Sequence, residues 1–87
     1  MYYYTTMDDI VTTHSAVIEE NGFDYVDVHF ERPNKNGFDF LDISLPGVIV
    51  EKAFGFSEDE ILDLKEYARD NEPLIWEFAR SGGGTVA

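Results

Sequence analysis

The sequence predicts a single α+β domain with an N-terminal helix, a three-stranded antiparallel meander, and a capped helix followed by a short helix. Apolar and polar residues alternate over residues 23–32, which is typical of a half-buried strand. Pro and Gly separate the apolar segments that follow it. The clearest helix start in the chain lies at Ser57. We expect residues 1–81 to form the domain and residues 82–87 to form a flexible Gly-rich tail.

The N-terminal part of the chain favours an extended segment followed by a helix. Three consecutive tyrosines in residues 1–6 have high β propensity, and we expect this segment to pack on the domain as a strand or an arm. Thr5 or Thr6 then provides an N-cap for a helix that runs to about Asn21. Gly22 is suited to the left-handed conformation that often follows a helix end. Residues at helical spacing would share one face of this helix: Ile10, His14, Val17 and Ile18.

Three strands are expected in the middle of the chain. The first strand, residues 23–32, leads through a loop at residues 33–37 into a return strand at residues 38–45. A Pro-Gly turn then leads to a short third strand at residues 48–52. One face of this meander would pack on the helices, and the other would face solvent. The residues expected on the free face are Asp27, His29, Glu31, Asp39 or Asp42, and Ser44.

The C-terminal helix has a complete set of start signals. Ser57 is the expected N-cap, and Glu60, three residues later, completes a capping box. Acidic residues in the first turn stabilise the helix, because their negative charge lies near the positive end of the helix dipole. We expect this helix to cover residues 58–70. Because Pro73 is well tolerated at a helix start, a second short helix, or a kinked continuation of the first, is expected at residues 74–80.

Charge is the strongest compositional feature of the chain. Eighteen Asp and Glu residues oppose six Lys and Arg residues, which gives a net charge of −12. The acidic residues are spread along the whole sequence and do not form an acidic tail. Such a surface repels nucleic acid and anionic membranes and attracts basic proteins. The simpler explanation of this charge is solubility, although the self-repulsion of so many charges reduces stability.

Two groups of carboxylates are the candidate partner-binding residues. One group follows a single stripe of the capped helix, and the other lies on the free face of the sheet. For each residue the alternative is a solvated surface acid. The candidates are Asp59, Asp63, Glu66 and Asp70 on the helix, and Asp27, Glu31 and Asp42 on the sheet.

The sequence contains no motif for catalysis or for a cofactor. There is no Cys, which excludes disulfides and thiolate sites. Phosphate loops, nucleophile elbows and zinc-protease motifs are also absent from the sequence. His29 lies between two acidic residues of one strand and, with Asp42, is the weaker alternative for a divalent metal site. We therefore predict a non-enzymatic protein that has no metal and no cofactor. His14 is expected to be a core or boundary residue.

Part of the chain resembles known small proteins. Residues 45–47, residues 55–60, Asn71 and the Ile75-Trp76 pair before a Gly-rich stop are similar to short uncharacterised bacterial and phage proteins. In size, acidity and lack of catalytic motifs the chain also resembles phage-encoded anti-CRISPR inhibitors. That resemblance implies a nucleic-acid mimic that blocks the basic surface of a partner such as a CRISPR effector. It assigns no functional residues.

The alternative is an antitoxin-like or self-associating regulatory domain that uses an aromatic surface around Tyr2, Tyr3, Tyr4 and Trp76. In both cases we expect no direct nucleic-acid binding and no membrane association, because basic residues are few and no apolar segment is long enough to span a bilayer. Met1 is expected to be the native start of a complete small protein. No signal peptide is evident, so a cytoplasmic protein is expected.

Overall fold

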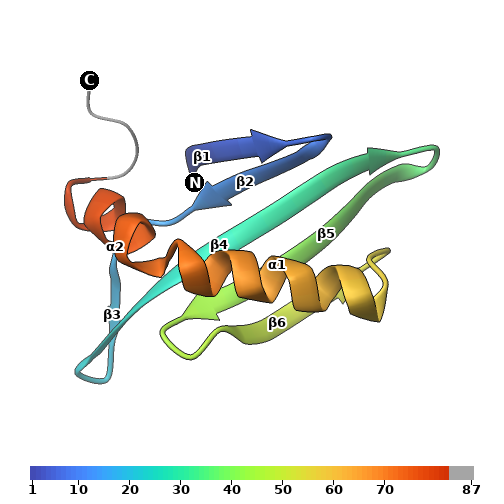
Figure 1. Cartoon of the computed structure of the whole chain (residues 1–87). Helices are drawn as coiled ribbons and strands as arrows, with labels where there is room; N and C mark the ends of the chain where they lie inside the picture. Colours follow the sequence, from blue (N-terminus) through green and yellow to red (C-terminus); the bar gives the residue numbers. More distant parts are fainter. Residues whose placement is uncertain (83–87) are drawn as a thin grey trace.

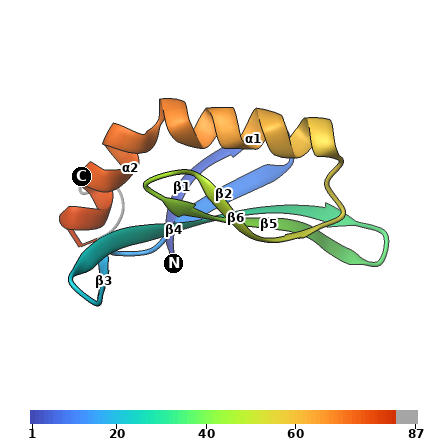
Figure 2. The ribbon, with the colours of Figure 1, turned by 90° about the horizontal axis from the view of Figure 1, so that it is seen from below.

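The computed structural model describes residues 1–82, which form a six-stranded antiparallel sheet with two helices (Figure 1). Both helices lie on the same face of the sheet (Figure 2). Residues 83–87, which make up most of the predicted tail, lie outside the described residues. The elements are β1 (Tyr2–Met7), β2 (Ile10–His14), β3 (Ile18–Glu20), β4 (Phe23–Asn34), β5 (Gly37–Leu45), β6 (Ile49–Phe54), α1 (Glu58–Asp70) and α2 (Glu72–Arg80).

The sheet is organised around β4, its longest strand. The strand order is β1-β2-β4-β5-β6, and the short strand β3 pairs with the beginning of β4. β4 therefore pairs with β2, β3 and β5. β1 and β6 form the two outer edges of the sheet.

The core lies between the sheet and the helices. Alternate residues of β4 and β5 point toward the helices, and their side chains are fully buried: Val26, Val28, Phe30, Leu41, Ile43 and Leu45. The helices contribute Leu64, Ala68, Ile75 and Ala79 to the same cluster. Because side chains alternate along a strand, the residues between these positions face away from the helices. The sheet therefore has one covered face and one open face.

The predicted N-terminal helix is wrong. Its residues form β2 and β3, and the tyrosine-rich segment before it forms β1, which pairs with β2. In β2 the residues that point into the protein are Thr12 and His14, both fully buried. Because these two buried residues are polar, the alternation typical of a strand was hidden in the sequence. The β-branched residues of β2 also favour a strand over a helix.

The sequence Asn21-Gly22 was interpreted as a helix stop, but it connects β3 to β4. Both residues have positive φ angles, 55° and 81°, and their neighbours Glu20 and Phe23 are paired across the turn. Asn-Gly is the preferred sequence for two-residue hairpin turns of this kind. The predicted three-stranded meander is therefore also wrong, because the sheet has six strands. The three expected strands correspond to β4, β5 and β6 within it.

The capping box of α1 is confirmed. The Ser57 hydroxyl accepts a hydrogen bond from the Glu60 N–H at 3.1 Å, and Glu60 Oε1 accepts one from the Ser57 N–H at 2.9 Å. The second helix begins at Glu72, slightly earlier than expected, with Pro73 in its first turn. A proline there removes an N–H group that has no partner within the helix.

An ion-pair cluster attaches the start of α1 to the end of β4. Arg32 of β4 donates hydrogen bonds to Glu60 of α1 and, at 2.9 Å, to Asp39 of β5. Asn34 also donates to Asp39, at 2.6 Å. Hydrogen bonds from Arg32 lower the pKa of Glu60 to about 2 and also lower the pKa of Asp39. The Arg32 guanidinium lies 4.4 Å from the ring centroid of Phe56, which completes the cluster.

The close approach of Gly55 to this cluster gives the first prediction. Gly55 has φ +87°, and a Cβ atom there would overlap the Asp39 carboxylate and lie 2.9 Å from its Cβ. Gly22 has a similar φ of +81°, but nothing lies within 4 Å of a Cβ built on it. Both Gly→Ala substitutions incur a left-handed penalty of about 1–2 kcal/mol. Gly55→Ala should destabilise the protein by at least ~1 kcal/mol more, because of the added overlap.

Urea unfolding of the two variants checks this prediction. Gly22→Ala is the matched control for the cost of the backbone conformation alone. Equal losses of unfolding free energy in the two variants would show that the contact with Asp39 is not tight.

Candidate functional site

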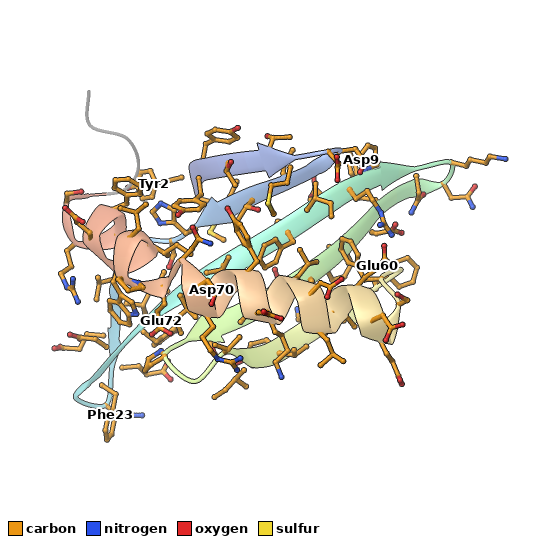
Figure 3. The ribbon with its side chains drawn as sticks, viewed as in Figure 1. Tyr2, Asp9, Phe23, Glu60, Asp70 and Glu72 are labelled. Carbon is orange, nitrogen blue, oxygen red and sulfur yellow. The ribbon has the colours of Figure 1, made fainter. Side chains whose placement is uncertain are left out.

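The two groups of predicted site residues lie on opposite sides of the molecule. The helix group projects from the side of α1 that faces away from the sheet, as Asp70 does in Figure 3. The sheet group belongs to β4 and β5, at positions that alternate with the buried core residues, and therefore lies on the open face. The two groups form two separate acidic surfaces.

The helix surface is a straight row of free carboxylates that consists of Asp59, Asp63, Glu66 and Asp70. Spacings of four, three and four residues place all four side chains along one stripe of α1. All four residues are exposed, and within residues 1–82 none of them forms an ion pair. With a rise of 1.5 Å per residue, the row is about 16 Å long. Leu62, whose side chain is 61% exposed, lies beside it on the same helix.

The carboxylates of the open face are engaged within the protein. His29 contacts Asp42 through Nδ1 and Glu31 through Nε2, the latter at 3.1 Å. A carboxylate only accepts hydrogen bonds, so the two nitrogens of His29 can satisfy both partners only as a protonated imidazolium. Burial lowers the pKa of His29, but the hydrogen bonds and charges of Asp42 and Glu31 outweigh it and raise the pKa above its usual value.

Asp27, the third predicted residue of the sheet group, lies in a more acidic environment. Burial, followed by the neighbouring charges of Asp42 and Glu51, raises the pKa of its carboxyl group. A hollow of about 580 Å³ on the open face is lined by these three residues together with Glu20 and Lys52. The Glu51 side chain accepts a hydrogen bond from the Ser44 hydroxyl at 3.0 Å. The open face therefore combines several carboxylates with few free cations.

A row of stacked rings also crosses the open face, and the sequence analysis missed it. The His29 ring stacks on Phe40 with centroids 6.3 Å apart, and Phe40 stacks on Phe54 at 5.9 Å. Phe54 is 62% exposed. The available signal was the position of Phe40 two residues before Asp42 in an alternating strand, which places both on one face.

The metal alternative at His29 gains no geometric support. Among residues 1–82, no group of three or more His, Asp and Glu side chains is arranged to hold a metal ion. The other histidine, His14, is fully buried, as expected for a core residue, although it belongs to a strand. Its Nδ1 donates to the Ser15 carbonyl at 2.8 Å.

The aromatic residues of the alternative hypothesis do not all face solvent. Tyr4 packs against the core, and its hydroxyl donates to Asn71 Oδ1 at 2.7 Å. Trp76 is partly buried, donates to Glu72 at 3.1 Å, and lies 5.3 Å from the Arg80 guanidinium. Tyr2 and Tyr3 are 40% and 55% exposed.

Comparisons with protein-family models, with curated proteins and with solved structures find no match to this chain. Within the described residues, neither helix has the length and apolar character needed to cross a membrane.

The carboxylate clamp on His29 gives the second prediction. An NMR titration of the imidazole should show His29 titrating above 6.5, and Asp42→Asn should lower its pKa. Because the folded-state pKa is raised, the clamp stabilises the fold fully below pH 6.5, and this contribution is lost as the pH rises through the folded-state value. The difference in unfolding free energy between wild type and His29→Gln should therefore be largest at acidic pH. A His29 pKa at or below 6.5 would contradict the clamp.

Proposed function

We propose that this chain is a non-enzymatic acidic protein that blocks a basic nucleic-acid-binding surface of a partner protein. The helix surface is the proposed contact. The observation that carries the proposal is the row of four exposed and unpaired carboxylates along one stripe of α1.

The sign and the linear arrangement of the charges on the helix surface support mimicry of a nucleic-acid strand. The four charges of the helix surface are separated by three intervals over about 16 Å, which gives roughly 5.5 Å per interval along the helix axis. One strand of duplex DNA has one phosphate charge per ~3.4 Å of its axis. A groove whose Lys and Arg residues follow a phosphate backbone therefore matches this row in sign and in its linear form, with the carboxylates spaced more widely than the phosphates.

The helix surface is favoured over the open face as the partner contact, because its carboxylates are not engaged with other side chains of the described chain. Asp42 and Glu31 already contact His29, and Asp27 is partly buried beside the carboxylates of Asp42 and Glu51, which together raise its pKa. The helix carboxylates give up only solvent when a partner binds. The net charge of −12 would also steer a basic partner toward the chain before contact. The exposed side chain of Leu62 is then an apolar anchor beside the charged row.

A counter-defence inhibitor similar to anti-CRISPR proteins is the concrete form of this proposal. Its partner is a nucleic-acid-guided effector or another basic nucleic-acid-binding protein of the host. Such an inhibitor competes with nucleic acid for one groove and needs no catalytic residue or cofactor.

Affinity capture from a bacterial lysate at low and then high salt tests the proposal. The expected result is a basic nucleic-acid-binding protein that elutes with salt, because exposed charge pairs are screened. Adding DNA or RNA should release it, and the purified partner should lose nucleic-acid binding when this chain is added. A partner that nucleic acid does not displace would contradict mimicry.

Charge reversal of the helix surface is the third prediction. The four substitutions Asp59→Lys, Asp63→Lys, Glu66→Lys and Asp70→Lys should weaken partner binding by more than about tenfold, because like charges then face each other. The matched control reverses four exposed acids elsewhere: Asp9→Lys, Glu19→Lys, Asp24→Lys and Glu77→Lys. Each variant changes four charges by two units, from a net −12 to −4.

Binding measured by calorimetry separates the two variants, with thermal unfolding as the check that both remain folded. Equal losses of affinity would show that net charge alone drives binding and that the helix surface is not the contact.

A further inference from the structure

The outer edge of β6 is an unpaired strand edge with a self-complementary sequence. Within residues 1–82, β6 pairs only with β5, and all six of its residues are exposed. The backbone N–H and C=O groups on the outer side of an edge strand are available to another strand. Two large apolar side chains, Ile49 and Phe54, are 56% and 62% exposed at the two ends of this strand.

We propose that β6 pairs antiparallel with β6 of a second copy of this chain. The two-fold axis passes between Glu51 and Lys52 and is normal to the sheet. This inference concerns self-association and is independent of the proposed contact on α1.

A β-bulge in β6 makes this register possible. Residues directly opposite in an antiparallel pair must point to the same face. In a regular strand, Ile49 and Phe54 are an odd number of residues apart and would point to opposite faces. The register shift opposite Asp42 and Ile43 changes this: Phe54 pairs with Phe40, and Ile49 pairs with Ser44. Phe40 and Ser44 are four residues apart on β5, so Ile49 and Phe54 both lie on the open face.

The same shift brings Val50 and Ala53 to the covered side, because they pair with Ile43 and Leu41. Both of the latter residues belong to the buried core. Glu51 and Lys52, which flank the shift, both line the hollow on the open face. Every pair of residues equidistant from the proposed axis therefore shares a face.

This register places matching side chains opposite each other. Ile49 faces Phe54 of the second copy, Val50 faces Ala53, and Glu51 faces Lys52. By symmetry each pair occurs twice, so the axis is surrounded by two apolar pairs and two pairs of opposite charge. Pairs of both kinds stabilise antiparallel strands. The other edge strand, β1, contains no charged residue and offers no such complementarity.

Two features of the chain oppose association, and they determine the concentration and the salt at which the test must be made. Each chain has a net charge of −12, so two copies repel each other at low ionic strength. A bulge and a lysine are also common means of protecting strand edges from pairing. Strictly monomeric behaviour of the wild-type chain up to high concentration, with salt present to screen the repulsion, would overturn the proposal.

Charge-swap variants give the fourth prediction, measured by sedimentation equilibrium in moderate salt. Glu51→Lys replaces two attractive pairs with two Lys–Lys pairs and should weaken the dimer by about tenfold. The double swap Glu51→Lys with Lys52→Glu restores both pairs in reverse and should restore dimerisation. Both variants lose the hydrogen bond to Ser44, so the rescue reports on pairing between copies.

The control is Glu77→Lys, which makes the same change in net charge on α2, away from β6. If net charge alone governed association, both single variants would dimerise more tightly than wild type. The proposed pairing instead predicts weakening for Glu51→Lys only. Tighter dimerisation of Glu51→Lys, or failure of the double swap to rescue, would overturn this register.

A disulfide cross-link tests the register directly, because the native chain contains no cysteine. Val50→Cys with Ala53→Cys places cysteines opposite each other in the dimer, within the Cα distance of about 4.4–6.8 Å that a disulfide requires. Within one extended chain these positions are roughly 10 Å apart and cannot be bridged. Mild oxidation should yield a covalent dimer, whereas Val50→Cys alone should not, because the two copies of residue 50 lie three residues out of register across the axis. Equal cross-linking of both variants would contradict the register.

Discussion

The attachment of α1 to the sheet by Arg32 determines the arrangement of both acidic surfaces. This residue lies near the end of β4 and donates to Glu60 in the first turn of α1 and to Asp39 on β5. Glu60 also closes the capping box with Ser57, so one carboxylate both starts the helix and fixes it to the sheet. With its first turn held there and Leu64 and Ala68 buried, α1 can point only its acidic stripe away from the core.

The acidic residues of this protein differ in what their charge does. Glu60 and Asp39 have lowered pKa values because they face Arg32, and they serve the fold. Asp42 and Glu31 contact His29 on the open face and raise its pKa. The helix carboxylates have no such partner within the described chain. A net charge of −12 thus includes carboxylates of three kinds, and only the free ones are suited to meeting a cationic surface.

Local signals predicted the second half of the chain well. The capping box at Ser57 and Glu60 depends on neighbours in sequence, and the alternation of Val26, Val28 and Phe30 reflects a purely apolar buried face. The prediction for the first half of the chain was wrong because β2 buries polar side chains, and because the sequence Asn21-Gly22 suits both a helix end and a hairpin turn. For the candidate site, helical spacing was enough to align Asp59 with Asp70. The sequence analysis also grouped His29 with Asp42, and the register of β4 and β5 places these residues opposite each other. That Glu31 contacts the same ring depends on side-chain conformations that the sequence does not define.

The order of strands in the sheet also has a consequence for the folding of the chain. Apart from β3, neighbouring strands in the sheet are consecutive along the sequence, so most pairings close short loops and can form early. The contacts between helices and sheet span more sequence, as between Tyr4 and Asn71. During synthesis the sheet emerges first, with its apolar face still uncovered. Residues 1–54 contain ten acidic and three basic residues, so this intermediate already has a net charge of −7. Mutual repulsion would then keep nascent sheets apart until α1 and α2 arrive to cover them.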